Sequence, residues 1–276
     1  MNGILIGIVT YNPEPTKLFK TLNSALNQDC PIIIIDNHSS NIDIWQKKIE
    51  NYDNVRLLTN KRNYGIARAL NQIFEWGEKQ SYKWILTLDQ DSVCPDNLVH
   101  ELFKYTDNDK MAVIGATIRD INKNDSIIKK KGIKPVDNCI TSGSLNKIAP
   151  WRHIGGFDEW MFIDGVDFDY CHRLRNAGYN VCVNQEVILT HEIGHIEIRK
   201  FMFWNVIVRN HSSFRKYYIV RNLIYLERKE HNGKVSFKSL IRCFKQLILV
   251  ILYEKDKIKK IERIIYGIID GIKAKI

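Results

Sequence analysis

One segment sets the fold class that we expect: Lys83-Trp84-Ile85-Leu86-Thr87-Leu88-Asp89-Gln90-Asp91-Ser92. Its short apolar run predicts a buried strand, which ends in two carboxylates. Residues i and i+2 of an extended chain point to the same side, so Asp89 and Asp91 converge. Converging carboxylates repel each other unless a hard cation such as Mg2+ or Mn2+ lies between them. The alternative is a strand end followed by a solvated turn.

Predicted strands and helices alternate over the first third of the chain. The strands are 3–9, 32–35, 55–58 and 84–88, and the helices are 16–27, 42–50 and 66–79. This alternation is typical of βαβ units and a mainly parallel sheet. Open sheets of this kind bind ligands at the carboxyl ends of their strands. One sheet edge should therefore collect the polar residues Thr10, Tyr11, Asp36, Asn37, Asp89 and Asp91.

The rest of the chain is less regular. Residues 111–118 and 139–145 predict further strands, with a polar loop or hairpin at 119–136. Residues 166–177 predict a helix that ends at Gly178, and nearly everything from Lys200 onward is compatible with helix. We therefore expect an α/β domain at residues 1–199 and a helical extension at residues 200–276.

Composition is that of an ordinary globular protein, with 276 residues, 45% hydrophobic and 26% charged. No secretory signal is visible, and no apolar run approaches the roughly 20 residues that span a bilayer. The six cysteines form no Cys-x-x-Cys pair, which is typical of reduced core thiols. These features lead us to expect a cytoplasmic protein.

Positive charge is concentrated in the last part of the chain. Residues 234–276 carry eleven Lys or Arg and four acidic residues, an excess of seven positive charges. The whole chain has a net charge of +10. Apolar residues at helical spacing over 240–253 and 258–272 predict basic amphipathic helices, which bind anionic membrane surfaces. The alternative is a helical cap that packs on the domain and exposes its lysines. No aromatic-basic motif for nucleic acid is evident, so we expect no nucleic-acid partner.

Several short motifs follow one another in a fixed order. They are Val9-Thr10-Tyr11-Asn12-Pro13, Asp36-Asn37-x-Ser39, the segment 63–71, Thr87-Leu88-Asp89-Gln90-Asp91-Ser92, Ser142-Gly143, Gly155-Gly156-Phe157-Asp158-Glu159, and the segment 162–169 followed by Arg173. In order and spacing, this set resembles the inverting family 2 glycosyltransferases of the GT-A fold. It is especially similar to bacterial rhamnosyltransferases that build surface polysaccharides. The resemblance implies a Rossmann-like sheet flanked by helices.

The resemblance implies a donor site for a nucleotide-sugar, either a dTDP- or a UDP-sugar. Asp36 would accept an N–H of the thymine or uracil base, and a strand-end carboxylate is chemically suited to that. Thr10 and Tyr11 would border the same nucleotide. The alternative for Asp36 is a turn cap.

The segment 63–71 belongs to the same implied donor site. Gly65 enters a helix and lets the backbone approach a ligand closely. Arg68, one turn further, would reach a phosphate. The alternative is a simple helix start with Asn63 as its cap.

The resemblance also implies a divalent metal, Mg2+ or Mn2+, that bridges the donor phosphates. Asp91 would ligate it directly, and Asp89 would bind the ribose or the water shell of the metal. His191 resembles the late histidine that completes this site. A lone His is more often structural, and His195 and His211 are nearby competitors.

Transfer with inversion needs a general base for the acceptor hydroxyl. Alignment on Arg173 places the family's base at Asp167, in the first turn of a predicted helix whose dipole stabilises the carboxylate. The acid that precedes the base in the family's Glu-Asp-x-Asp pattern is replaced here by Val166. Asp164 supplies a nearby carboxylate or a helix cap, and Asp169 is placed to pair with Arg173 at i+4.

The implied acceptor is a saccharide carried on a polyprenyl diphosphate. Ser142, Gly143 and Asp164 would contact it, and Trp151 and Trp160 would stack on its sugar rings. The alternative for the aromatic residues is the core. Such an acceptor fits a transferase of dTDP-activated rhamnose, bound peripherally to the inner face of the cell membrane.

Three other functions use similar residues. A nucleotidyltransferase also pairs carboxylates with a metal, but it should carry a Gly-rich basic loop where this chain has Thr10-Tyr11-Asn12-Pro13. A glycosidase uses two carboxylates, yet hydrolysis needs no nucleotide-binding strand edge. A non-catalytic basic module that binds RNA or membrane would not depend on Asp89 or Asp91.

Overall fold

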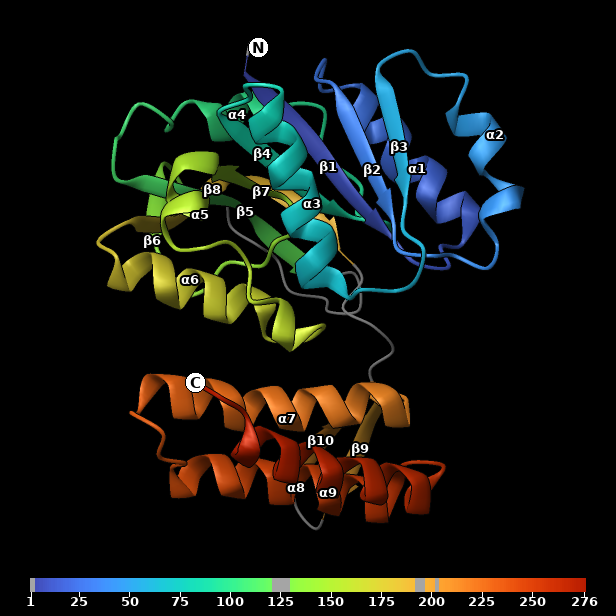
Figure 1. Ribbon diagram of the computed structural model, residues 1–276, viewed down its shortest axis with the longest axis vertical. Helices are drawn as coiled ribbons and strands as arrows, with labels where there is room; N and C mark the ends of the chain where they lie inside the picture. Colours follow the sequence, from blue (N-terminus) through green and yellow to red (C-terminus); the bar gives the residue numbers. More distant parts are fainter. Residues whose placement is uncertain (1–2, 121–129, 192–196, 202–203) are drawn as a thin grey trace. The chain divides into compact units, whose positions relative to one another are not determined.

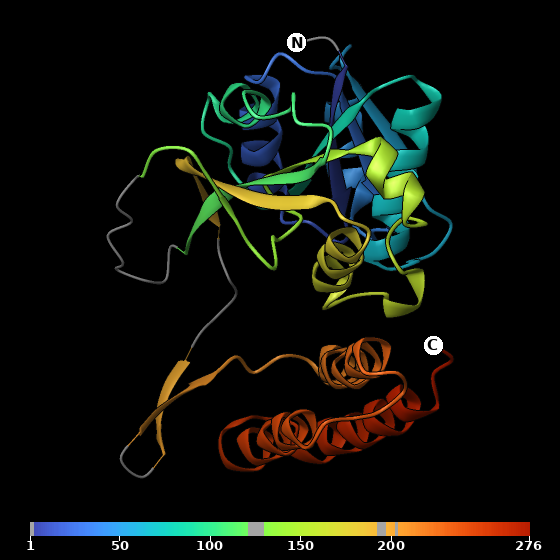
Figure 2. The ribbon, with the colours of Figure 1, turned by 90° about the vertical axis from the view of Figure 1, so that its left-hand side faces the viewer.

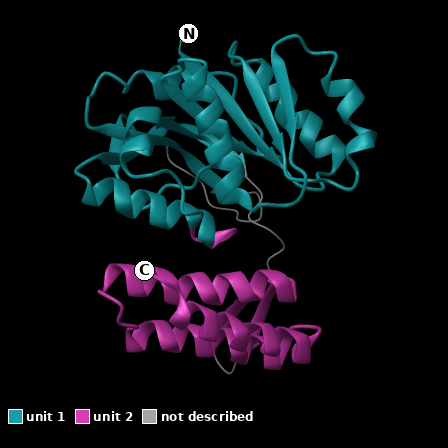
Figure 3. Cartoon of the chain, viewed as in Figure 1, with its two compact units in different colours: residues 1–160, 166–192 teal, residues 161–165, 193–276 magenta. Residues whose placement is uncertain are grey.

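We describe the protein from a computed structural model, in which residues 3–120, 130–191, 197–201 and 204–276 are described. The chain forms two compact units (Figure 3). Unit 1 comprises Met1–Trp160 and Val166–Glu192, and unit 2 comprises Met161–Gly165 and Ile193–Ile276.

The later boundary falls between Glu192 and Ile193, whereas we expected it after residue 199, and the short segment Met161–Gly165 also belongs to unit 2. Asn222 explains this membership. Its Nδ2 atom donates to the carbonyl oxygen of Met161 at 2.8 Å and to those of Ile163 and Asp164 at 2.7 Å. Contacts made far along the chain therefore fix this segment, and local sequence does not show them.

Unit 1 is built on one eight-stranded sheet (Figure 1). In spatial order the strands are β3 (Val55–Thr59), β2 (Ile32–Asp36), β1 (Ile4–Thr10), β4 (Trp84–Asp89), β7 (Ser144–Lys147), β5 (Met111–Asp120), β8 (Asn180–His191) and β6 (Ile133–Pro135). Strands β1 to β4 are parallel, β7 is antiparallel to β4 and β5, and β5 is parallel to β8. The predicted α/β class with a mainly parallel sheet is confirmed.

Helices cover both faces of this sheet. They are α1 (Pro15–Leu26), α2 (Gln46–Ile49), α3 (Ile66–Lys79), α4 (Leu98–Phe103), α5 (Ile148–His153) and α6 (Val166–Asn176). Figure 2 shows α1 and α4 on one face and α3 on the other. Successive side chains of a strand point to opposite faces of the sheet, so β1 contacts helices on both faces. Ile4, Ile6 and Ile8 pack with α1 and α4, whereas Gly7 lies against Ile73 of α3, which leaves no room for a side chain.

Strand register places the site residues along one edge. Thr10 is level with Asp36 in the β1–β2 pair, and Val9 is level with Asp89 in the β1–β4 pair. Three parallel strands therefore end together, and their polar termini line the carboxyl edge of the sheet. The predicted collection of Thr10, Asp36 and Asp89 at one edge is confirmed in the backbone.

The predicted strand at 139–145 is wrong, since β7 begins only at Ser144. Gly143 adopts a φ of +74°, and its N–H donates to the carbonyl of Thr87 at 2.8 Å. The N–H of Ser144 returns to the carbonyl of Thr141 at 3.2 Å. A tight turn therefore replaces the first part of the expected strand.

Unit 2 combines a hairpin with three helices. The hairpin pairs β9 (Glu197–Phe201) with β10 (Trp204–Val208), and the helices are α7 (Ser213–Glu230), α8 (Phe237–Tyr253) and α9 (Lys257–Lys273). The hairpin corrects the expectation that the chain is helical from Lys200 onward. The two helices predicted at 240–253 and 258–272 are present as α8 and α9. Among the described residues, no helix combines the length and the apolar character that crossing a bilayer requires.

A buried ion triad holds the helices of unit 2 together. Glu254 accepts from Lys216 Nζ at 2.6 Å and from Lys260 Nζ at 3.0 Å. All three side chains are buried, so the charges are compensated inside the unit. Lys260 is therefore not part of the basic surface that the composition of the tail predicts.

Candidate active site

The carboxylate of Asp36 lies at the end of β2 and is 1% exposed. Its Oδ1 accepts from Thr10 Oγ1 at 2.9 Å and from Ser39 Oγ at 2.5 Å, and its Oδ2 accepts from the Ser39 N–H at 2.8 Å. A carboxylate has about four acceptor positions, and these contacts occupy two on Oδ1 and one on Oδ2. Thr10 is buried and supports Asp36, whereas the ring of Tyr11 is exposed at the same edge.

Asn37 fastens the segment before α3 to the end of β2. Its Nδ2 donates to Asn63 Oδ1 at 2.9 Å and to the carbonyl of Gly65 at 3.1 Å, and its Oδ1 accepts from the Tyr64 N–H at 2.9 Å. Gly65 precedes α3 with a φ of +86°, a conformation that favours glycine. The predicted donor residues Asn63 and Gly65 therefore lie beside the edge that carries Asp36. Asn37 organises this region, although the sequence pointed only to its place at a strand end.

The turn from Asp89 to Ser92 is held by neighbouring strands and loops. The Asp89 N–H donates to Ser142 Oγ at 3.0 Å, and Ser142 Oγ donates to Ser92 Oγ at 2.7 Å. The N–H of Tyr11 donates to Gln90 Oε1 at 2.8 Å. These contacts fix the direction of the turn that carries Asp91.

Backbone pairing brings the end of β8 to the same turn. Val93 forms an isolated bridge with Thr190, the residue before His191. His191 itself is level with Asp120 of β5, and its side chain is outside the described part of the structure. The predicted proximity of His191 to Asp91 is therefore supported in the backbone only.

The donor set at this turn suits a hard divalent cation. Asp89 and Asp91 are half-buried carboxylates at a strand end, and Mg2+ and Mn2+ are often bound by one or two carboxylates together with substrate phosphates. Over residues 3–120, 130–191, 197–201 and 204–276, no three His, Cys, Asp or Glu side chains are grouped as metal ligands. The arrangement fits a cation that the donor diphosphate helps to hold.

Asp167 lies in the first turn of α6. Burial, helped by the charge of Asp167, raises the pKa of the Cys171 thiol to about 12. Burial is also the main cause that raises the pKa of Cys139, with a smaller contribution from the charge of Asp167. The predicted pair of Asp169 and Arg173 is confirmed at 2.7 Å.

Three residues predicted to contact the acceptor are built into the protein. Ser142 is buried and its hydroxyl serves the Asp89 turn. Gly143 is needed because Leu189 occupies the space of a Cβ there. Trp151 is 7% exposed, with its ring centroid 5.2 Å from that of Phe74. These three contacts with the acceptor stay predictions, and the more exposed Trp160, at 39%, is the stronger candidate.

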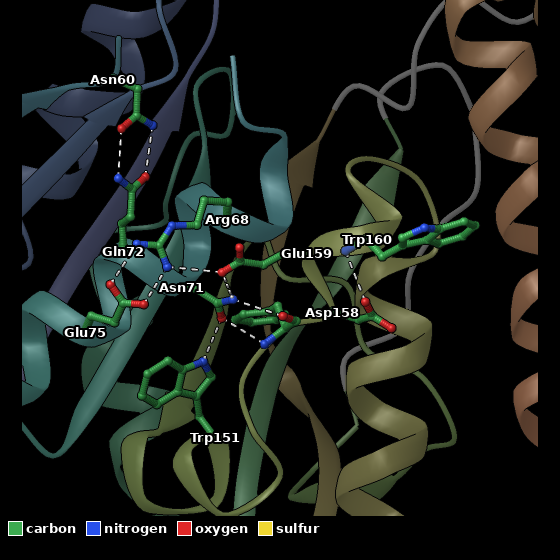
Figure 4. A network of polar contacts seen from close by, with 10 residues as sticks. Asn60, Arg68, Asn71, Gln72, Glu75, Trp151, Asp158, Glu159 and Trp160 are labelled. Atoms are coloured by element: carbon green, nitrogen blue, oxygen red, sulfur yellow. Dashed lines mark hydrogen bonds and ion pairs between the residues drawn. The ribbon is translucent and has the colours of Figure 1, made fainter. Parts of the chain in front are cut away.

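Arg68 is part of a polar network on α3 (Figure 4). Its guanidinium binds Glu75 at 2.6 Å and Glu159 at 3.1 Å, and the hydrogen bond to Glu75 raises its pKa. Arg68 would have to exchange these partners to reach a phosphate.

Asp164 belongs to unit 2, where Arg215 Nη2 lies 2.9 Å from its Oδ1. Its φ of +66° is uncommon for a residue with a side chain. Asp164 therefore has a defined partner within its own unit.

The network in Figure 4 contains a residue whose role the sequence analysis missed, Asn71. It is buried on α3, where it follows Ala67 by four residues and precedes Phe74 by three, and both of these are buried. A polar residue at apolar spacing on a helix is the signal that points to it.

Comparisons with known proteins agree with this arrangement. The chain is 29% identical to the dTDP-rhamnosyl transferase RfbF of Shigella flexneri over 290 residues, which cover 99% of this chain and 96% of the relative. Its fold is similar to that of S. aureus TarS 1–349 in complex with UDP-GlcNAc, with a TM-score of 0.60, 14% identity, and coverage of 96% of this chain and 81% of TarS. It is also similar to GalNAc-T7 with UDP, GalNAc and Mn2+, with a TM-score of 0.61 and 13% identity. That match covers 80% of this chain and 47% of GalNAc-T7.

The family model described as glycosyl transferase family 2 matches residues 5–174, more than half of the chain. The chain therefore belongs to glycosyl transferase family 2 and is a glycosyltransferase of the GT-A fold.

Proposed function

We propose that this glycosyltransferase is a metal-dependent inverting rhamnosyltransferase that uses a dTDP-activated donor. The observation that carries the proposal is the strand register, which aligns the ends of β1, β2 and β4 and so sets Asp36 and Asp89 on one edge. The full-length likeness to a dTDP-rhamnosyl transferase supports the choice of donor. The product would enter surface polysaccharide synthesis.

The donor base would bind at Asp36 and Tyr11. The Asp36 carboxylate would accept the N–H of thymine or uracil. The exposed ring of Tyr11 supplies a stacking surface, and its backbone is fixed by Gln90. Asn63 and Gly65 would approach the diphosphate through their backbone, since no side chain at Gly65 intervenes.

Asp91 would hold Mg2+ or Mn2+ directly, with Asp89 and His191 completing its surroundings. When bound, the cation offsets the negative charge that grows on the leaving nucleoside diphosphate. Ser142 and Gln90 hold the turn that carries the two carboxylates. The carboxylates therefore need not move when the cation and the donor bind.

Asp167 would act as the general base. Its carboxylate takes the proton of the acceptor hydroxyl while that oxygen attacks the anomeric carbon from the face opposite the diphosphate. The bond to the diphosphate breaks with its electron pair on the departing oxygen, and the anomeric configuration inverts. Asp167 lies in the first turn of α6, where the helix dipole favours a negatively charged side chain.

The acceptor would be a saccharide on a lipid carrier. Trp160 offers an exposed ring for sugar stacking, and the contact of Asp164 with the acceptor stays a prediction. A polyprenyl-diphosphate carrier would place this acceptor at the inner face of the cell membrane. The enzyme would then need an affinity for that surface.

Helix α8 supports such a membrane contact. One face packs inside unit 2 through Ser239, Cys243 and Val250, which are buried. The other face exposes large apolar side chains, namely Phe237, Leu240, Ile241, Phe244, Ile251 and Leu252. Residues 237–253 contain three cations and no acid. An apolar stripe with flanking cations suits the interface of an anionic bilayer, where each cation contributes on the order of 1 kcal/mol.

A donor screen tests the proposed reaction. The purified chain is incubated with dTDP-rhamnose, UDP-glucose or UDP-GlcNAc, with Mg2+, Mn2+ or EDTA, and release of the nucleoside diphosphate is measured. The proposal predicts release from dTDP-rhamnose that EDTA abolishes and added metal restores. Release that persists in EDTA would refute the metal dependence, and release only from UDP-sugars would refute the donor.

A further inference from the structure

The side-chain amide of Asn71 uses all of its hydrogen-bonding positions inside unit 1 (Figure 4). Its Oδ1 accepts from Trp151 Nε1 at 3.1 Å and from the Phe157 N–H at 2.8 Å. Its Nδ2 donates to the Phe157 carbonyl and to Glu159 Oε1, both at 2.9 Å. One side chain of α3 thus pairs with both backbone groups of Phe157, as a neighbouring strand would.

Arg173 of α6 holds the same turn from its other side. Its Nη1 donates to the Ile154 carbonyl at 2.9 Å and its Nη2 to the Gly156 carbonyl at 2.7 Å, while its Nε binds Asp169. Gly156 has a φ of +78°, and a Cβ there would lie 2.8 Å from Asn71 Oδ1. The turn at residues 154–157 is therefore clamped between α3 and α6.

This clamp connects the two ends of the candidate site. Helix α3 starts directly after the segment that Asn37 binds. Asn37 lies at the donor edge, which is the edge of the sheet formed by the carboxyl ends of β1, β2 and β4. Helix α6 carries Asp167 one turn before Tyr170, whose ring is stacked on Phe157 with centroids 4.2 Å apart. The position of Asp167 relative to the donor edge therefore depends on the contacts that Asn71 and Arg173 make.

We propose that Asn71 and Arg173 are positioning residues, which set the place of the base Asp167 through the turn at residues 154–157. The inference rests on the proposed function of Asp167. A general base must come within hydrogen-bond reach of the hydroxyl it deprotonates, and a misplacement of about 1 Å lowers the rate on the order of a hundredfold. Neither residue is assigned a contact with the donor, so donor binding should not need them.

Asn71→Asp tests the proposal with a side chain of the same shape. It keeps Oδ1 but turns an acceptor toward the Phe157 carbonyl and Glu159. We expect kcat to fall at least tenfold, with the KM for the donor and its metal-dependent Kd within twofold of the wild type. The loss should grow as pH rises, because the introduced carboxyl group still donates one hydrogen bond while it is protonated.

A second substitution should repair the first. In Asn71→Asp with Glu159→Gln, the new amide donates to the new carboxylate and reverses the polarity of that hydrogen bond, so kcat should recover severalfold. Arg173→Lys is an independent test. It keeps a positive charge for Asp169 but loses the two hydrogen bonds to the carbonyl groups of Ile154 and Gly156. It should show the same split between kcat and donor KM. Arg175→Lys, on the same helix and paired with Asp137, is the matched control and should leave kcat unchanged.

Two results would overturn the inference. One is a lowered Tm with unchanged kcat for the folded Asn71→Asp and Arg173→Lys variants, which would make the clamp purely structural. The other is a parallel loss of kcat and donor affinity without repair by Glu159→Gln. A wild-type chain that transfers no sugar, in contrast, would refute the proposed function itself.

Discussion

Asp89 and Ser142 are joined by a hydrogen bond of 3.0 Å from the amide of the first to the hydroxyl of the second, across 53 residues of sequence. The same hydroxyl donates to Ser92 at 2.7 Å, so it holds both ends of the turn that carries Asp91. A buried serine therefore supports the two carboxylates on which metal binding is proposed to depend.

Ser142→Ala should weaken this turn. The Asp89 N–H would lose the hydroxyl of Ser142, and because this hydrogen bond is only partly buried, the loss should cost about 1 kcal/mol of unfolding free energy. We expect a corresponding loss in urea denaturation and a several-fold weaker metal-dependent binding of dTDP. Ser40→Ala, which removes an exposed hydroxyl, is the control and should have little effect. Unchanged stability and unchanged dTDP binding in Ser142→Ala would contradict this role.

The two tryptophans of one segment should respond in opposite ways. Trp151→Ala empties a packed site and should cost about 3–5 kcal/mol of unfolding free energy. Trp160→Ala should change stability far less, because its side chain is 39% exposed, but it should raise the KM for the acceptor. Denaturant unfolding and acceptor titration of both variants check this. Equal losses of stability would show that the assignment of core and surface is wrong.

His211 predicts a pH dependence of stability. Its burial, helped by the charge of Arg215 and opposed by Asp164, lowers its pKa from 6.5 to about 4. Between these values the unfolded chain binds a proton at this site that the folded chain does not. Stability should therefore fall as pH drops from 6.5 toward 4, and this group adds no slope above 6.5. His211→Gln should reduce the difference in unfolding free energy between pH 6.5 and about pH 4, the window that this shift spans. An unaltered difference would contradict the shift.

The exposed face of α8 predicts a charge-dependent membrane affinity. Phe244 is 62% exposed, and Phe244→Glu places an acid in the middle of the apolar stripe. We expect full-length protein to float with vesicles rich in anionic lipid, and the variant to bind at least tenfold less. Ile44→Glu, which changes a 70% exposed residue of unit 1, is the matched control and should bind like the wild type. Binding that is equally weak for all three proteins would remove the membrane contact.

The sequence predicted the donor edge because its signals are local. An apolar strand that ends in a polar residue shows where β1, β2 and β4 stop, and parallel pairing then brings Thr10, Asp36 and Asp89 level. The hairpin of β9 and β10 was missed although Trp204–Val208 is rich in the β-branched and aromatic residues that are typical of strands.

The local sequence pattern likewise could not predict which of the aromatic residues are buried. Trp151 and Trp160 stand nine residues apart in one loop-rich segment. The contact with Phe74 and the hydrogen bond to Asn71 place the first in the core. The roles of Ser142 and Asn71 also arise from partners far along the chain.

The most direct test of the account is calorimetric titration of dTDP into the wild type, Asp91→Asn and Asp167→Asn, each with Mn2+ and with EDTA, alongside turnover of dTDP-rhamnose. Both variants should lose turnover. Asp91→Asn alone should lose the metal-dependent part of dTDP binding, while Asp167→Asn should bind dTDP like the wild type. Metal-dependent binding that survives in Asp91→Asn, or turnover that survives in Asp167→Asn, would contradict the roles assigned to these two carboxylates.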